Sequence, residues 1–225
     1  MSATARVLLV TLVTSVAGYR FDEASSSEVV VRSEVVVSEV AERYRSVAGG
    51  FTDRARAVPE ASWSNASPCE GWDARDIVRH MVEWMPAFLH SGAGVELPVG
   101  PPVDDDPVGA WVTMSDGIQA LLDDPETSER DFVNEHTGRH PLDEAIGMFI
   151  LGDVLIHTWD LARATGLDET LDAAEVRAMR EGMEPMGDTL SRSGHYAKRI
   201  DVPDDASEQV RLLALTGRNS GGGNA

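Results

Sequence analysis

Cysteine is nearly absent from this sequence of 225 residues. The single thiol, Cys69, cannot form an internal disulfide, and no CxxC zinc pattern exists. A chain without disulfides suits a reducing compartment, so we expect a cytoplasmic protein.

Positive charge is also scarce. The sequence has 19 Lys and Arg residues against 38 Asp and Glu, which gives a net charge of −19, and Lys198 is its only lysine. Nucleic-acid phosphates and anionic membrane surfaces both need basic side chains for binding. We therefore expect neither a nucleic acid nor a membrane as a partner.

Long apolar runs are missing too, since no stretch approaches the roughly 18 apolar residues that a membrane-spanning helix needs. Residues 7–18 have the length of a signal-peptide core, and a valine-rich repeat, EVVVRSEVVV, follows at 28–37. Three interpretations of this N-terminal region remain: a weak export signal, a hairpin-like extension, or residues upstream of the true start. We treat residues 1–37 as an extension outside the fold, 38–218 as the folded domain and 219–225 as a disordered tail.

Apolar residues recur at helical spacing in the remaining chain. Four amphipathic helices predict an all-α protein, a four-helix bundle with a short helical C-terminal extension. The fourth is apolar almost all round, so we expect it at the centre. The bundle helices are predicted over residues 38–58, 74–89, 107–122 and 142–166, and further helices over 172–191 and 207–215.

The fourth predicted helix contains one charged residue in an apolar stretch. Between Ala145 and Ile156 only Asp153 is charged, and it precedes His157 by four positions, which puts both on one helix face. A buried carboxylate is costly without a partner. A metal ion, a hydrogen-bonded histidine or an arginine from another helix could each serve.

A second polar residue lies inside an apolar stripe. His80 shares the inner face of the second predicted helix with Ile77, Met81 and Trp84. Facing helices of a bundle can bring such side chains together. His80, Asp153 and His157 would then supply three ligands for zinc, the favoured ion, or for nickel, iron or manganese, leaving positions open for water or substrate.

Three segments resemble a known family. They are SPCEGWDARDIVRHMVEW (67–84), GDVLIHTWDLARATGLD (152–168) and VPDDASEQVRLLALTGR (202–218). They are similar to the DinB-like, mycothiol-dependent maleylpyruvate isomerase N-terminal family, and in particular to its small metal-binding members. The resemblance implies a DinB-like fold and a divalent metal held by His80, Asp153 and His157. This chain has Asp153 where the isomerase has glutamate.

The neighbours of these ligands have alternative roles. Asp160 would orient a ligand histidine as an outer partner of the metal, or pair with Arg163 on the helix surface. Trp84 would wall the pocket or pack in the core. We expect Cys69 to be a small buried side chain rather than a reactive thiol.

Three functional hypotheses follow. The first is an enzyme, a thiol-dependent transferase or isomerase acting on a small electrophilic substrate, with mycothiol as the thiol that the family resemblance implies. The second is a non-catalytic metal-binding bundle with a regulatory or partner-binding role. The third is a buried His–Asp pair without metal. The expected partners are a small-molecule substrate or thiol, with a homodimer left open.

Overall fold

The computed structural model describes residues 38–221 except 136–137, 188 and 193–195. The predicted extension at 1–37 and most of the predicted tail, residues 222–225, lie outside the described residues. Within them the chain is mostly helical with one small hairpin, so the expected all-α, DinB-like fold class is confirmed. The main helices are α1 (Glu39–Ala57), α2 (Ala74–Ala93), α3 (Pro107–Asp123), α6 (Leu151–Thr165), α7 (Ala173–Met183) and α9 (Glu208–Leu215).

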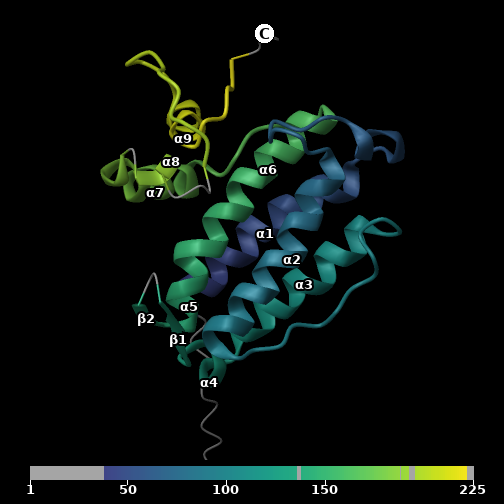
Figure 1. Ribbon diagram of the computed structural model, residues 1–225, viewed down its shortest axis with the longest axis vertical. Helices are drawn as coiled ribbons and strands as arrows, with labels where there is room; N and C mark the ends of the chain where they lie inside the picture. Colours follow the sequence, from purple (N-terminus) through teal and green to yellow (C-terminus); the bar gives the residue numbers. More distant parts are fainter. Residues whose placement is uncertain (1–37, 136–137, 188, 193–195, 222–225) are drawn as a thin grey trace, which may run out of the picture. The chain divides into compact units, whose positions relative to one another are not determined.

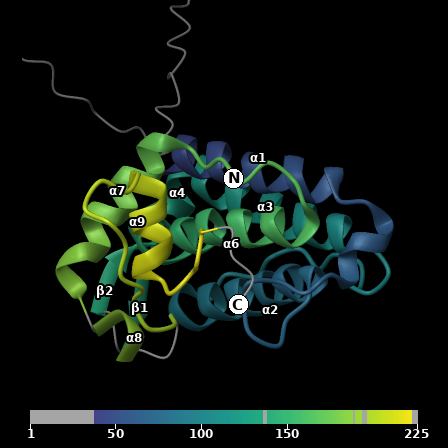
Figure 2. The same cartoon turned by 90° about the horizontal axis from the view of Figure 1, so that it is seen from above.

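Four of these helices surround the core (Figure 1). Helices α1 and α2 each pack against both α3 and α6. Figure 2 shows α6 running between α1 and α2, and nearly all of its side chains are buried, as expected for a central helix. The largest fully buried side chains include Trp111, Trp159, Tyr44, Phe51 and Phe132.

Helix ends follow from capping residues in the sequence. Asp73 accepts a hydrogen bond from the backbone N–H of Asp76, whose side chain accepts one in return from the N–H of Asp73. This reciprocal capping box fixes the start of α2. The helix then runs to Ala93, beyond its predicted end at residue 89, and stops at Gly94 with φ 64°. At the end of α6, Gly166 adopts the left-handed conformation that only glycine enters freely.

The fourth predicted helix begins as a short turn, α5 (Leu142–Ala145), and passes through a π-helical segment, η2 (Ile146–Ile150), before α6. The sequence gives no sign of this change in hydrogen-bond register. A π segment inside a helix is often found beside a functional site. Here it directly precedes the turn that carries Asp153.

The polar connection before this helix contains a hairpin that was not predicted. After the short helix α4 (Pro125–Ser128), strand β1 (Asp131–Asn134) pairs antiparallel with β2 (Gly138–Pro141). Phe132 of β1 is fully buried and packs near Phe88 of α2, with ring centroids 4.7 Å apart. Among the described residues of the hairpin, Phe132 is the only buried side chain, so its apolar contact comes from one position rather than from an alternating pattern.

The C-terminal extension differs from the single long helix predicted at residues 172–191. Helix α7 ends at Met183, and a 3-10 turn, η3 (Glu184–Met186), separates it from the short α8 (Thr189–Arg192). Pro185 lacks the N–H that a continuing helix needs, which explains the break. Helix α9 starts at Ser207 as expected, with that side chain as its cap, and α7 packs against both α9 and α6.

Leu142–Thr165 is long and apolar enough to cross a membrane by length and composition alone, with a hydropathy of 1.4. The expectation that no stretch approaches this limit was therefore wrong, because the aliphatic residues of this helix outweigh its two central carboxylates, Asp153 and Asp160, in the mean hydropathy. The mean hydropathy refers to an 18-residue window of this helix, and 72% of that window is buried inside the structure, as in the core helix of a globular fold.

Candidate metal centre

The three predicted ligands lie together. His80 comes from α2, and Asp153 and His157 from successive turns of α6. Their donor atoms all lie within 4.8 Å of one another. The Nε2 atoms of His80 and His157 are each 3.5 Å from a different oxygen of Asp153, Oδ2 and Oδ1 respectively. The carboxylate thus lies between two imidazoles, and its short side chain still reaches both.

Two tryptophans border this group. The Trp72 ring lies 4.9 Å from that of His80 and 6.0 Å from that of His157, between centroids. The indole N–H of Trp84 donates a hydrogen bond to Asp153 Oδ2 at 3.0 Å. Trp84 therefore contacts the predicted ligand directly, and the ring of Trp72 packs beside both histidines.

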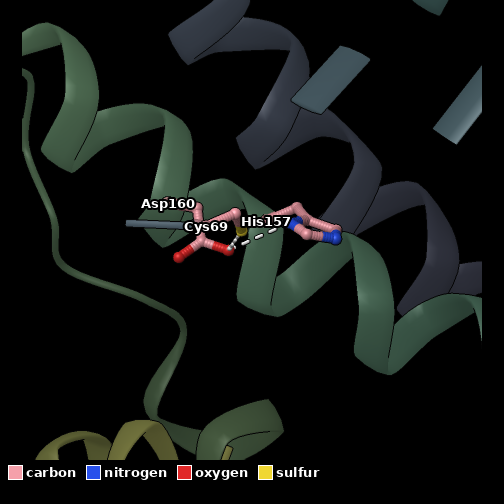
Figure 3. A group of neighbouring side chains, drawn as sticks. All are labelled: Cys69, His157 and Asp160. Carbon is pink, nitrogen blue, oxygen red and sulfur yellow. Dashed lines mark hydrogen bonds and ion pairs between the residues drawn. The ribbon is translucent and has the colours of Figure 1, made fainter. Parts of the chain in front are cut away.

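Asp160 is completely buried and accepts hydrogen bonds from three sides. Its Oδ2 atom is 2.9 Å from His157 Nδ1, 2.9 Å from Arg218 Nη2 and 3.4 Å from Cys69 Sγ. In Figure 3, dashed lines run from one oxygen of the Asp160 carboxylate to the sulfur of Cys69 and to the ring of His157. The alternative pairing with Arg163 is wrong, because that guanidinium binds Glu169 at 2.7 Å.

Cys69, His157 and Asp160 form a second cluster of metal-ligand atoms. Here, however, a cation is already in place. The guanidinium of Arg218 lies 2.9 Å from Asp160 Oδ2 and 3.6 Å from the Cys69 sulfur. A metal ion at this point would have to displace it, so we assign this cluster to a buried ion pair.

The carboxylates change the acidity of the histidine between them. Burial alone would lower the pKa of His157, but the charges of Asp153 and Asp160 raise it to about 10. Burial likewise opposes ionisation of Asp160, but His157 and Arg218 lower its pKa to about 2. The pKa of Asp153 is also lowered, since the two histidines outweigh its burial. The centre therefore attracts positive charge at the position between Asp153 and His157.

Two residues beside the centre were missed as site residues. Arg218 follows α9 and is far from Asp160 in sequence. Tyr196 precedes α9, and burial raises the pKa of its hydroxyl to about 12, with the charge of nearby Asp153 acting in the same direction. Arg218 does close the third segment that carries the family resemblance, but no spacing rule connects that position with α6.

Comparison with known proteins identifies the family. Residues 44–162 match the family described as the mycothiol maleylpyruvate isomerase N-terminal domain. The chain belongs to this family. The matched residues of this isomerase-family domain include His80, Asp153, His157 and Asp160, whereas Tyr196 and Arg218 lie outside them.

No curated protein matches the chain. Among solved structures, a histidine-to-alanine mutant of a mycothiol-dependent maleylpyruvate isomerase is similar with a TM-score of 0.47 and 15% identity. The match covers 81% of this chain and 89% of that one.

Proposed function

We propose that this protein binds one divalent metal ion through His80, Asp153 and His157, and uses it in a thiol-dependent isomerase or transferase reaction on a small electrophile. The observation that carries the proposal is the convergence of these donors from two helices. Two imidazoles, which are neutral when they bind a metal, and a carboxylate form the donor set of many catalytic zinc sites, so zinc is the first choice, with nickel, iron or manganese next.

The donors fit a metal in their chemistry as well as in their spacing. Nδ1 of His157 is hydrogen-bonded to Asp160, so Nε2, on the side of Asp153, is the ring nitrogen that can bind a metal. In protein metal sites a ligand histidine usually donates its other ring N–H to a carboxylate or a carbonyl, as His157 does to Asp160. Trp84 likewise orients Asp153 through its indole N–H.

Three protein donors leave coordination positions for a thiol and a substrate oxygen. A bound ion would supply Lewis-acid polarisation and lower the pKa of a coordinated thiol. The protein's own residues would orient the ligand atoms, and the rings of Trp72 and Trp84 would limit the access of water to them. Family membership supports mycothiol as the thiol. Its thiolate would add to an electrophilic carbon of a conjugated double bond while the π electrons move to the substrate's carbonyl oxygen, and expulsion of the same thiolate would restore the double bond and release the thiol.

An activity assay with matched variants tests this proposal. Protein is treated with a chelator, reloaded with zinc, and incubated with mycothiol and maleylpyruvate, the substrate in the family's description, while the absorbance of the substrate is followed. We expect turnover that requires both metal and thiol. It should be lost in His80→Ala and Asp153→Asn but kept in His90→Ala, an exposed histidine of the same helix that pairs with Glu96.

The outcomes separate the functional classes. Tight metal binding without thiol-dependent turnover of this or related electrophiles would favour the non-catalytic, regulatory or partner-binding bundle. Turnover that survives complete removal of metal would contradict the proposal.

A further inference from the structure

Arg218 is fixed in place by its own backbone. Its N–H donates a hydrogen bond to the carbonyl of Leu213 at 2.8 Å, which closes the end of α9. The preceding Gly217 adopts φ 77°, and a Cβ there would lie 2.6 Å from Cβ of Ala197. No residue other than glycine fits this tight, left-handed position without strain. The guanidinium is therefore presented from a well-defined turn.

The guanidinium of Arg218 is largely occupied by protein groups. Nε and Nη2 donate to the two oxygens of Asp160 at 3.3 and 2.9 Å, and Nη1 donates to the carbonyl of Thr216 at 3.1 Å. Only 12% of the side chain is exposed. This arginine is bound on the protein side and has little left to offer an anionic substrate.

The same oxygen of Asp160 connects Arg218 with His157. Oδ2 accepts from Arg218 Nη2 and lies 2.9 Å from His157 Nδ1. A two-point contact with a guanidinium sets both the position and the plane of a carboxylate. The plane of Asp160 in turn sets the direction in which the His157 ring points its Nε2 atom.

We propose that Arg218 is a positioning residue of the metal centre: through Asp160 it holds the imidazole of His157 with Nε2 directed at Asp153. The C-terminal extension thereby supports a centre whose three proposed ligands all come from α2 and α6. This inference rests on the proposed function, and it assigns a role in metal binding to a residue outside the family match.

The test compares two arginines that both connect α6 with the C-terminal segment. Arg163 donates to the carbonyl of Ser220 at 3.2 Å and to Glu169, whereas Asp160 pairs with Arg218. Cobalt(II) serves as the probe, because its visible absorption reports ligand geometry, and affinity is measured by competition with a chelator. Arg218→Met should bind about 10- to 100-fold more weakly, the usual effect of losing such a partner. Arg163→Met should bind as the wild type does.

Arg218→Lys covers the case in which Arg218→Met does not fold. It keeps the charge but loses the two-point contact, so its affinity should fall between those of the wild type and Arg218→Met and its cobalt spectrum should shift. Unchanged affinity and spectrum in both Arg218 variants would overturn the inference. An equal loss in Arg163→Met would also overturn it, because the effect would then reflect general loosening of the extension.

A crystal structure of metal-free Arg218→Met, or of Arg218→Lys, tests positioning without any metal. We expect the His157 ring to rotate, so that Nε2 lies farther from Asp153 Oδ1 than the 3.5 Å seen here. An unmoved ring would overturn the inference even if the metal proposal holds. If the wild type binds no metal, the proposed function fails, and the ring position still decides whether Arg218 orients His157.

Discussion

Asp160 is a carboxylate with no exposed surface, yet its lowered pKa keeps it charged. A buried charge is tolerated only where partners compensate for the lost hydration. His157, Cys69 and Arg218 supply this compensation. The same hydrogen bonds therefore stabilise the buried charge of Asp160 and place its carboxylate beside Nδ1 of His157.

Removing the cationic partner should therefore destabilise the fold strongly. We expect Arg218→Met to lower the free energy of unfolding by about 3–5 kcal/mol, the usual effect of leaving a buried charge unpaired. Urea titration measures this change. In the double variant Asp160→Asn/Arg218→Met much of the loss should be recovered, since no charge is left behind. Arg163→Met, which breaks a half-exposed pair, should cost at most about 1 kcal/mol.

Local spacing was enough to find part of this centre. An aspartate and a histidine four residues apart, in a run without other charges, point to a buried site, and a histidine in an apolar stripe suggests the facing partner. The role of Arg218 could not be predicted, because its contact with Asp160 depends on how the C-terminal extension folds back. The sequence suggested a ligand histidine or Arg163 as the partner of Asp160; the tertiary structure retains His157, excludes Arg163 and adds the distant Arg218.

At the level of elements, the contact of β1 with α2 depends on a missing side chain. Gly92 lies in α2 directly beside the ring of Phe132, where a Cβ would overlap it. Gly92→Ala should lower the free energy of unfolding by about 1–3 kcal/mol, because the buried ring cannot move away freely. Thermal and urea unfolding measure the effect.

A second glycine on a helix provides the matched control. Gly49 lies in α1, and among the described residues no atom outside its chain neighbours and its own helix backbone lies within 4 Å of the position of its Cβ. Gly49→Ala should stabilise the protein by about 0.5–1 kcal/mol through helix propensity alone. Equal effects of the two substitutions would contradict the packing described for the hairpin.

The start of α2 should respond to loss of its cap. Asp73→Ala removes the side-chain acceptor for the N–H of Asp76, which should cost about 1 kcal/mol in the free energy of unfolding. Denaturant titration checks this value. Asp73→Asn, which keeps an acceptor oxygen, should retain most of the stability; an equal loss in both variants would rule out capping as the cause.

Helix positions and caps were predictable because they depend on neighbours in sequence. Apolar stripes located the four long helices. The helices predicted over 38–58 and 207–215 begin at the residues that cap α1 and α9, Ser38 and Ser207, and the helix predicted over 74–89 begins directly after Asp73, the cap of α2. The π segment and the hairpin were not predictable, since each is set by tertiary contacts. The break after Met183 had a signal in Pro185, which the periodic pattern outweighed.

At the scale of the whole molecule, the described residues all belong to one compact unit. We expect a chain cut to residues 38–218 to keep the unfolding midpoint and the metal content of the full-length protein, because it retains the cap at Ser38 and the ion pair of Arg218. Urea unfolding and elemental analysis of both chains measure this. A large loss of stability would place part of the deleted segments within the fold.

The measurement that tests the metal centre most directly is elemental analysis of protein purified without an affinity tag. We predict about one divalent ion per chain, lost in both His80→Ala and His157→Ala and kept in His90→Ala. A wild-type protein without metal, or equal metal in all four proteins, would contradict the account and leave a helical bundle with a buried His–Asp cluster.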